Sequence, residues 1–569
     1  MARLDWRRLA WVLVLGGLAL WSRPPATAMA QSRPADWRFG VIESTESPAD
    51  ATDLGAGWTR VRFQWAEVQP HSPDEWLPPV SEGALAVEAA AGREVVGMLI
   101  GIPDWARGED EMPAGLHLPA DDPHNLWAGF VRQAVTRYAN RIDHWIIWNE
   151  PDIWDPTTPG HTWDGDEADF LQLQRVAYRT AKAANPRAII HLAAMTYFWD
   201  AQFGREQYLS RLLDLIVADP EAAANHAYFD VLTAHIYFQP ASVYDVMTTF
   251  NTILRDHGLD KPIWLVETNA PPSDDPAWPV ASVTLKVLQV EQAAFMPQSL
   301  ALALAAGAER VAVYKLRDTD GDYAANPEPF GLVRQDGSRR PAFEAARVAF
   351  RLLTGVRAAD RERWDAVGQV RLTQADRVTT VVFARLPLPQ VAEVPRVGDS
   401  ANAWLVDMWG KRRTIEAVDG VFRVNLPPAV CAQSIGDYCM IGGLVTYVVQ
   451  PLSADADLDA PPPLATPTPL PTFTSTPTAT PLPTVTPSVT PSVTPSVTPS
   501  VTPSVTSSVT PSATSLPTVL PSVTPTISPQ ATLSASGGSV DAGIPWSFWL
   551  LGAAFVLGAA FLVLWRQRE

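Results

Sequence analysis

The sequence is poor in cysteine and in positive charge, and each shortage excludes a class of protein. Only two of its 569 residues are cysteines, Cys431 and Cys439, which is too few for a disulfide framework. Lysines and arginines number 43 against 61 aspartates and glutamates, giving a formal net charge of −18. Because nothing offers a basic stripe to phosphates, no nucleic-acid partner is expected.

The motifs of several enzyme classes are also missing. The chain contains no H-E-x-x-H, no G-x-S-x-G and no G-x-x-x-x-G-K-[ST], so metalloprotease, serine-hydrolase and P-loop chemistry lack support. The nine histidines are not spaced as metal ligands. We therefore expect neither a metal nor a cofactor.

Charge is absent from one long tract near the C-terminus. Residues 460–540 contain no charged residue and are rich in Thr, Ser, Pro and Val. Such a segment cannot bury a core and stays extended. We predict that residues 454–543 form a low-complexity stalk, and its Ser/Thr-Pro composition favours O-glycosylation.

Both ends carry membrane-related signals. Residues 1–30 are predicted to be a signal peptide, with three arginines, an apolar run and a small-residue cleavage site; an uncleaved anchor is the alternative. Residues 544–565 are apolar and uncharged, which predicts one transmembrane helix, with a buried core helix as the alternative. Arg566 and Arg568 place the tail 566–569 in the cytoplasm. The large domain is thus expected outside the cell, anchored to its surface.

Between these ends, strand-like and helix-like segments alternate about eight times over residues 31–354. This alternation predicts an α/β fold of the (β/α)₈ type, the TIM barrel. An open doubly wound sheet is the main alternative, but no Gly-rich phosphate turn follows the first predicted strand.

The composition and periodicity of each segment indicate where the strands and helices of the barrel lie in the sequence. Strands are expected at residues 37–42, 58–65, 94–102, 145–148, 188–194, 229–236, 262–267 and 310–316. Helices are expected at residues 125–138, 169–184, 208–217, 243–257, 299–307 and 340–353.

Short β-type runs separated by turn residues follow the barrel. They predict a small all-β accessory domain over residues 355–453. Cys431 and Cys439 lie in this region, and in an exported protein the simplest expectation is one local disulfide between them. Two free buried thiols are the alternative.

Two glutamates stand where predicted strands end. Glu150, preceded by Asn149, follows the fourth strand and Glu267 ends the seventh. In a closed barrel both tips open on the same face. Paired carboxylates are what glycosidic bond cleavage requires, one as proton donor and one as nucleophile. Asn149 would position a substrate hydroxyl.

The run Trp148-Asn149-Glu150-Pro151 resembles the Asn-Glu-Pro signature of clan A glycoside hydrolases. This resemblance implies that Glu150 is the acid/base and Glu267 the nucleophile. Glu-Thr-Asn at residues 267–269 is closest to family thirty-nine.

The same resemblance implies three further substrate-binding residues. They are Arg62 on strand two and His235 and Tyr237 on strand six. Tyr314 on strand eight is predicted to bind substrate as well. Many clan members carry a Trp at the tip of strand eight, and here Tyr314 or Lys315 replaces it. His235 also suits a buried core histidine.

Five tryptophans fall in loops after predicted strands: Trp105, Trp154, Trp163, Trp199 and Trp278. They suit sugar-stacking platforms or ordinary loop packing, and Trp105 is predicted to bind substrate.

These residues together predict a monomeric, cell-surface glycosidase acting on carbohydrate, and the resemblance to clan A implies that its mechanism is retaining. The alternative is a non-catalytic surface protein whose barrel only binds glycans or other partners. The presence of both glutamates favours the enzyme, and the sugar itself is not specified by the sequence.

Overall fold

The computed structural model describes residues 35–466, except residues 159, 282, 284, 326, 327 and 454. The predicted signal peptide, membrane helix, cytoplasmic tail and the stalk beyond residue 466 lie outside the described residues. Among the described residues, no helix combines the length and the apolar character needed to cross a bilayer.

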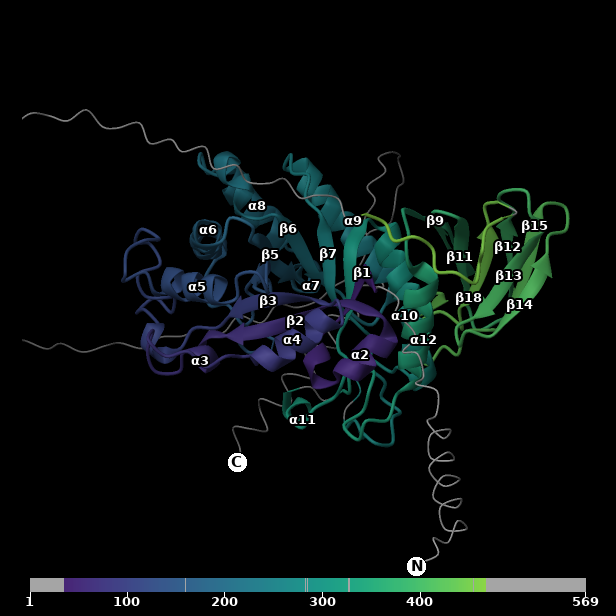
Figure 1. Ribbon diagram of the computed structural model, residues 1–569, viewed down its shortest axis with the longest axis horizontal. Coiled ribbons are helices and arrows are strands. Elements are labelled where there is room, and N and C mark those ends of the chain that lie inside the picture. The colour runs from purple at the N-terminus through teal and green to yellow at the C-terminus, as the bar shows by residue number, and fades with distance from the viewer. Residues whose placement is uncertain are drawn as a thin grey trace, which may run out of the picture. The chain divides into compact units, whose positions relative to one another are not determined.

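Eight parallel strands form a closed barrel, as the alternating sequence predicts, and β1 pairs with β8 to close it (Figure 1). Its strands are β1 (Asp36–Val41), β2 (Ala56–Gln64), β3 (Glu94–Ile100), β4 (His144–Ile147), β5 (Ile189–Met195), β6 (Val231–His235), β7 (Ile263–Thr268) and β8 (Ala308–Val313). Because every strand runs the same way, their C-terminal ends share one face.

Helices lie around the outside of these strands (Figure 1). The longer ones are α2 (Pro48–Leu54), α4 (Glu82–Ala90), α5 (Leu126–Arg137), α6 (Glu167–Ala184), α8 (Tyr208–Ala218), α9 (Pro240–Asp256), α10 (Gln289–Ala305) and α12 (Pro341–Leu353). Short helices α3 (Trp65–Val68), α7 (Phe198–Phe203) and α11 (Asp322–Ala325) lie within loops.

Helix α10 is longer than its sequence predicts. The helix is expected to begin at residue 299, yet it begins at Gln289 and runs through Pro297, which has no backbone N–H to donate. Residues 291–304 of α10 are buried. Tertiary burial therefore outweighs the local preference of proline here.

Strand β4 ends earlier than its sequence predicts. The apolar run continues through Trp148, but the strand stops at Ile147 because Trp148 has a φ of 73°. Glu150 also has a positive φ, 49°, and its N–H donates to the carbonyl of Ala194 at 3.1 Å. The left-handed backbone turns the chain at the barrel rim, before Pro151 can end the ladder.

A β-rich region follows the barrel, also as predicted. Its strands are β9 (Ala358–Trp364), β10 (Val367–Thr373), β11 (Arg377–Ala384), β12 (Gln390–Pro395), β13 (Asn402–Asp407), β14 (Arg412–Glu416), β15 (Val421–Leu426), β16 (Ser434–Ile435), β17 (Tyr438–Cys439) and β18 (Thr446–Pro451). Six of them form one antiparallel sheet, and β12 and β15 pair in a separate two-stranded sheet that shares an apolar core with it.

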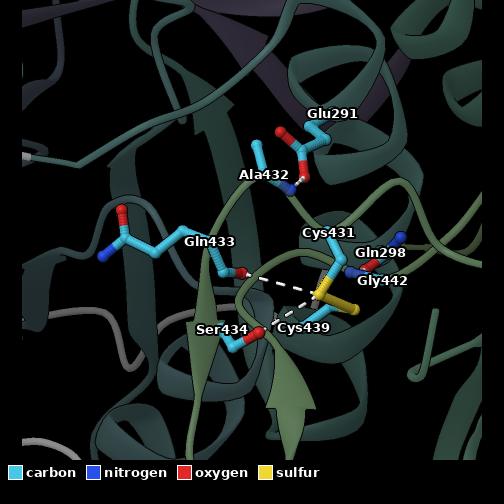
Figure 2. Close-up of a disulfide and its surroundings, with 8 residues drawn as sticks. All are labelled: Glu291, Gln298, Cys431, Ala432, Gln433, Ser434, Cys439 and Gly442. Carbon is cyan, nitrogen blue, oxygen red and sulfur yellow. Dashed lines mark hydrogen bonds between the residues drawn. A yellow bond between two sulfur atoms is a disulfide. The ribbon is translucent and has the colours of Figure 1, made fainter.

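A disulfide closes the short β16–β17 hairpin, where Cys431 is joined to Cys439. The adjoining loops dock onto α10: the N–H of Ala432 donates to Glu291 at 2.8 Å, and Gln298 bonds the backbone of Gly442 at 3.1 Å (Figure 2). Because Gln298 is fully buried, these bonds satisfy polar groups in the contact between barrel and β-rich region.

Candidate active site

Two carboxylates converge at the C-terminal face of the barrel. Glu150 follows β4 and Glu267 lies near the end of β7, and barrel closure brings these distant positions together. One oxygen of Glu150 and one of Glu267 lie within 4.8 Å of each other. The side chain of Glu267 is 8% exposed and that of Glu150 is 17% exposed. The more buried carboxylate is therefore the one on the strand.

An arginine of β2 pairs with Glu267, but it is Arg60 and not Arg62. An Arg60 guanidinium nitrogen lies 2.5 Å from Oε1 of Glu267, and both side chains are buried. Arg62 is 56% exposed and pairs with Glu67 at 3.2 Å. Residues 60 and 62 share one face of the strand. The carboxylate of Glu267 lies beside Arg60, the more buried of the two arginines. The prediction for Arg62 is therefore wrong in register by two residues.

His235, the last residue of β6, lies between the two carboxylates. Its Nδ1 is 2.6 Å from Oε1 of Glu150, and its Nε2 is 3.5 Å from Oε1 of Glu267. A neutral imidazole carries one N–H and one acceptor nitrogen. His235 can therefore donate a hydrogen bond to one carboxyl group and accept one from the other when that group is protonated. Its side chain is buried.

Tyr237 lies two residues beyond β6 and donates its hydroxyl hydrogen to Oε2 of Glu267. Burial and the neighbouring Glu267 charge raise the pKa of Tyr237 well above its usual value, so the phenol keeps its hydrogen. Its ring packs edge-on against Tyr314, with centroids 6.2 Å apart. Tyr237 is thus positioned as a neutral donor to the carboxylate.

The pKa of Glu267 is the result of opposing effects. Burial raises it, but Arg60, His235 and Tyr237 together outweigh burial and hold the pKa of Glu267 below its ordinary value. A carboxylate with a charged partner and a hydrogen-bond donor stays ionised at neutral pH. This is the protonation state that a nucleophile requires.

Asn149 precedes Glu150 and is half-buried at the barrel rim. Its carbonyl accepts a hydrogen bond from Thr162 at 2.5 Å, and it forms a bridge to Ala194 of β5. These backbone contacts fix Asn149 between β4 and β5. Its contact with a sugar hydroxyl stays a prediction.

A second carboxyl group, Asp152, fixes the loop after β4. Its Oδ2 accepts from the N–H and hydroxyl of Thr196, at 2.7 and 2.9 Å, and from the N–H of Tyr197 at 3.0 Å. Burial raises the pKa of Asp152 to about 7, and the Glu150 charge adds to this effect. The contacts join the loop that carries Glu150 to the end of β5.

Tyr314, which is predicted to bind substrate, follows β8. Its ring packs against Phe330 with centroids 5.5 Å apart. Lys315 does not share this position, because its Nζ pairs with Glu43 at 2.6 Å and Asp322 at 2.7 Å. Of the two predicted replacements, Tyr314 is the one that contacts Tyr237.

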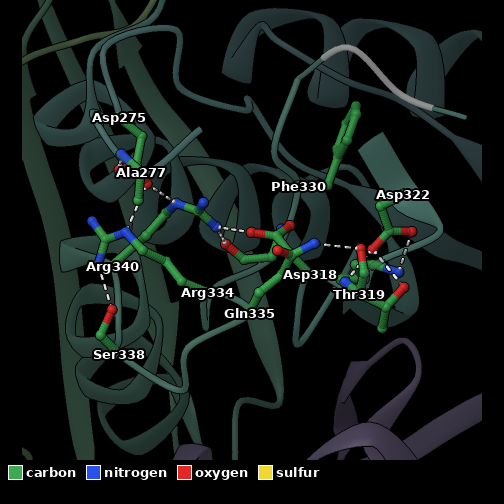
Figure 3. Close-up of polar contacts among 12 residues, drawn as sticks. Asp275, Ala277, Asp318, Thr319, Asp322, Phe330, Arg334, Gln335, Ser338 and Arg340 are labelled. Atoms are coloured by element: carbon green, nitrogen blue, oxygen red, sulfur yellow. Dashed lines mark hydrogen bonds and ion pairs between the residues drawn. The ribbon is translucent and has the colours of Figure 1, made fainter. Parts of the chain in front are cut away.

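Buried ion pairs fix the loops after β7 and β8. Arg340 is fully buried and pairs with Asp275 at 2.7 Å and with Asp318 at 2.5 Å (Figure 3). Arg334 also pairs with Asp275, at 2.7 Å. Breaking a buried pair on one side leaves an uncompensated charge, so these contacts hold the loops rigidly. The sequence gives no signal for this network because its members are far apart along the chain.

The loop tryptophans divide into two groups. Trp163, Trp199 and Trp278 are buried, with 2–7% of their surface exposed, so packing is their main role. Trp105 and Trp154 are half-buried. The indole N–H of Trp105 donates to the carbonyl of Gln69 at 2.7 Å, which fixes its ring in the loop after β3. The predicted contact of Trp105 with substrate stays a prediction.

Glu150, His235 and Glu267 are also the one group of described residues whose donor atoms are close enough to share a cation. Any cation would have to compete with Arg60 for Glu267, since that guanidinium already contacts the carboxylate at 2.5 Å. The guanidinium of Arg60 already supplies the positive charge that a bound cation would bring. The cluster is therefore better suited to proton transfer and nucleophilic attack than to metal binding.

No protein-family model and no curated protein matches this chain. Among solved structures, a family 39 glycoside hydrolase from Bacteroides cellulosilyticus WH2 is similar, with 17% identity and a TM-score of 0.54, over 73% of this chain and 81% of the other.

Two other solved structures are more distant. A family 39 β-xylosidase from Caulobacter crescentus has 15% identity and a TM-score of 0.47, covering 74% of this chain and 96% of its own. A family 30 endoxylanase from Clostridium papyrosolvens C71 has 14% identity and a TM-score of 0.47, covering 74% and 98%.

The likeness to the Bacteroides structure establishes the fold class: this protein is a TIM barrel with a β-rich region after it. At this level of identity, the chemistry must be argued from the residues of the chain itself.

Proposed function

We propose that this protein is a retaining glycoside hydrolase that cleaves O-glycosidic bonds of oligo- or polysaccharides. The observation that carries the proposal is the approach of Glu150 and Glu267, whose oxygens lie within 4.8 Å. Retaining glycosidases hold their two carboxyl groups about 5–5.5 Å apart, whereas inverting ones leave about 6.5–9.5 Å for a water molecule. The oxygens of Glu150 and Glu267 approach more closely than the inverting spacing, which supports double displacement.

In the first step, the ionised Glu267 attacks the anomeric carbon and a glycosyl-enzyme ester forms. The bond to the leaving oxygen breaks, and the proton of Glu150 passes to that oxygen. In the second step, Glu150 removes a proton from water while the water oxygen attacks the same carbon. The ester bond breaks, Glu267 recovers its charge, and Glu150 is again protonated.

The contacts of Glu267 fit its role in this cycle. Arg60 and Tyr237 both bind the Glu267 carboxylate, so they keep it ionised before attack and favour its release as an anion afterwards. His235 contacts both carboxyl groups and so lies beside the proton at each stage. Glu150 has no arginine partner among the described residues, which suits a group that must repeatedly gain and lose a proton.

The test is a screen of aryl glycosides with the wild type, Glu150→Ala and Glu267→Ala. We expect Glu267→Ala to abolish turnover of every substrate. Glu150→Ala should slow substrates with poor leaving groups most, because a good leaving group needs no proton. Glu67→Ala is the matched control, since Glu67 is 66% exposed and, among the described residues, pairs only with the exposed Arg62. Full turnover in either active-site variant would remove that glutamate from its role.

The alternative is a non-catalytic surface protein whose barrel binds glycans. It predicts that the wild type binds sugars without turning over any glycoside in the screen. The contacts of Arg60 and Tyr237 with Glu267 favour the enzyme, because binding alone requires no nucleophile held ionised in a buried position.

We further propose that the hydrolase is exported and anchored at the cell surface as a monomer. The supporting features are the apolar segments at residues 1–30 and 544–565 and the uncharged tract between barrel and C-terminus. Protease treatment of intact cells should release the active barrel into the medium. Activity that stays protected until the cells are lysed would contradict this location.

A further inference from the structure

The chain returns from β7 to α10 through residues 285–288, which we call the return segment. It contains neither helix nor strand, so its backbone groups need partners elsewhere. The N–H and the hydroxyl of Ser273 both donate to the carbonyl of Val287, at 2.8 and 3.1 Å. The N–H of Gln289, which follows the return segment, donates to Asp274 at 2.8 Å. The return segment therefore lies against the chain that leaves β7.

The β-rich region supplies further contacts at the same place. They come from residues 431–439, the ring that the disulfide closes, which we call the disulfide ring (Figure 2). The side-chain oxygen of Gln433 accepts a hydrogen bond from the N–H of Lys286 at 2.8 Å. The N–H of Ala432 donates to the carboxyl group of Glu291 at 2.8 Å. The disulfide ring thus bonds both the return segment and the start of α10.

Glu291 is the residue at which these contacts meet. It lies in the first turn of α10 and is only 3% exposed. One of its oxygens accepts from the N–H of Leu288 at 2.9 Å, and the other accepts from Ala432. Because a buried carboxyl group needs hydrogen-bond donors, the docked disulfide ring satisfies a polar group of the barrel and fixes the helix start.

The start of α10 is also bonded to the end of β7. Gln292 is fully buried, and its amide donates to the side-chain oxygen of Asn269 at 3.3 Å. Asn269 directly follows β7 and donates to the carbonyls of Tyr314 and Phe330, at 2.6 and 2.7 Å. Glu267 lies two residues earlier, on β7 itself. A movement of the start of α10 therefore reaches the strand end that carries Glu267.

The disulfide prepares the ring for this contact. It joins residues that are 8 apart in sequence, which removes conformations that an open loop would sample. Strands β16 and β17 pair within the ring, and the N–H of Met440 donates to the carbonyl of Gln433 at 2.9 Å. Ala432 and Gln433 are therefore already constrained, so little conformational entropy is lost when they bond the barrel.

We propose that the disulfide ring of the β-rich region is a positioning element for the active site. It holds the return segment and the start of α10, and through them the end of β7 with Glu267. The β-rich region thus contributes to the placement of the nucleophile. The effect on catalysis rests on the proposed glycosidase activity, whereas the effect on the return segment does not.

The test compares the full chain carrying Gln433→Ala with the wild type, by hydrogen exchange and by steady-state kinetics. Loss of the acceptor frees the N–H of Lys286, so exchange in residues 285–289 should become about threefold faster or more. Exchange in β3 should stay unchanged. The kcat for an aryl glycoside should fall about threefold to tenfold, with KM within about twofold, because the nucleophile is less well placed.

Two further variants show whether the hydrogen bond is the cause. In Gln433→Glu a carboxylate oxygen can accept the same N–H, so exchange and kcat should return to within about twofold of the wild type. Gln390→Ala is the matched control, since this glutamine also lies in the β-rich region and its amide bonds Leu388 at 3.3 Å. It should change neither quantity.

Removal of the disulfide should have a larger effect than Gln433→Ala. Combining Cys431→Ala with Cys439→Ala leaves Ala432 and Gln433 in an open loop, so kcat should fall about tenfold or more. Thermal unfolding shows whether this double variant is folded. If it is not, Gln433→Ala decides alone.

Unchanged exchange in residues 285–289 of Gln433→Ala would overturn the proposal, and so would faster exchange with an unchanged kcat. A deficit of equal size in Gln433→Glu or in Gln390→Ala would do the same. A wild type without any activity would contradict the proposed function. Exchange would then decide, since faster exchange in Gln433→Ala supports the hold on the return segment and unchanged exchange overturns it.

Discussion

The two ends of the barrel carry similar side chains in different proportions. At the C-terminal end, one histidine and one arginine contact two carboxylates, Glu150 and Glu267. At the N-terminal end, two histidines and one arginine are joined to a single carboxylate, Glu94. The pair of carboxylates is therefore the feature that distinguishes the C-terminal end of the barrel from its N-terminal end.

The N-terminal cluster is a chain of contacts across four strands. His144 on β4 lies 2.9 Å from His191 on β5 and 3.0 Å from Glu94 on β3. Arg310 on β8 reaches the same carboxylate at 2.6 Å. The pKa of Glu94 is held well below its ordinary value by His144 and Arg310, against the opposing effect of burial. The one carboxylate of this cluster is thus bound by both His144 and Arg310.

We therefore expect the C-terminal end of the barrel to carry the activity and the N-terminal end to contribute to stability. Polar groups at the C-terminal face of a barrel serve chemistry, and those at the other face serve stability. Removing a group from the first should change rates more than stability, and removing one from the second should do the reverse.

The largest effect is expected for Glu150→Gln. Loss of the acid/base group should lower kcat for a substrate with a poor leaving group about 10²–10⁴-fold. The melting temperature should change by only a few degrees, since the carboxyl group is 17% exposed and bonds only His235 among the described residues. Steady-state kinetics and thermal unfolding check both parts. A large loss of stability with kcat retained would contradict the division.

The next effect concerns the pH profile in Arg60→Met. Ionised Glu267 is the active form, and Arg60 lowers its pKa, so activity persists at low pH in the wild type. Without the arginine, the pKa of Glu267 rises, so as the pH is lowered the variant loses activity at a higher pH than the wild type does. We expect the acid limb of kcat/KM to move up by about one pH unit or more. Arg62→Met serves as the control, and an equal displacement there would reject the assignment of Arg60.

A third prediction concerns Glu94→Gln at the N-terminal end. The buried Arg310 would then face a neutral amide, and the free energy of unfolding should fall by about 1–3 kcal/mol. The kcat/KM value should stay within about twofold of the wild type, because nothing at the C-terminal face is touched. Urea unfolding monitored by fluorescence gives the first quantity. A tenfold loss of activity in the folded variant would refute the separation.

The smallest effect is a change in the pH dependence of stability in His191→Gln. Burial holds the pKa of His191 well below its usual value, so the unfolded chain takes up a proton below about pH 6.5 that the folded protein does not. Stability is therefore lost as pH falls through this range.

The slope attributable to His191 is about 1.4 kcal/mol per pH unit, and His191→Gln should remove it. Urea unfolding at pH 7 and pH 5 measures the difference between the two proteins. An identical loss of stability in wild type and variant would exclude His191 as its source.

The fold and the two glutamates could be predicted from sequence because both depend on local pattern. The alternation of strands and helices predicts the barrel, and a charged residue ending an apolar strand identifies Glu150 and Glu267. Barrel closure then requires the two to share a face.

The details that sequence could not give depend on depth and on long-range contacts. Strand alternation places Arg60 and Arg62 on one face without telling which reaches Glu267. The continuation of α10 through Pro297 depends on burial that no local window contains.

The central claim, that Glu150 and Glu267 act as a retaining pair, is tested most directly by the stereochemistry of the product. Proton NMR of the first-formed sugar, recorded before mutarotation, shows which anomer the enzyme releases. An oxygen separation within 4.8 Å predicts the same anomeric configuration as in the substrate. Release of the opposite anomer would show direct attack by water and would contradict the assignment of Glu267 as nucleophile.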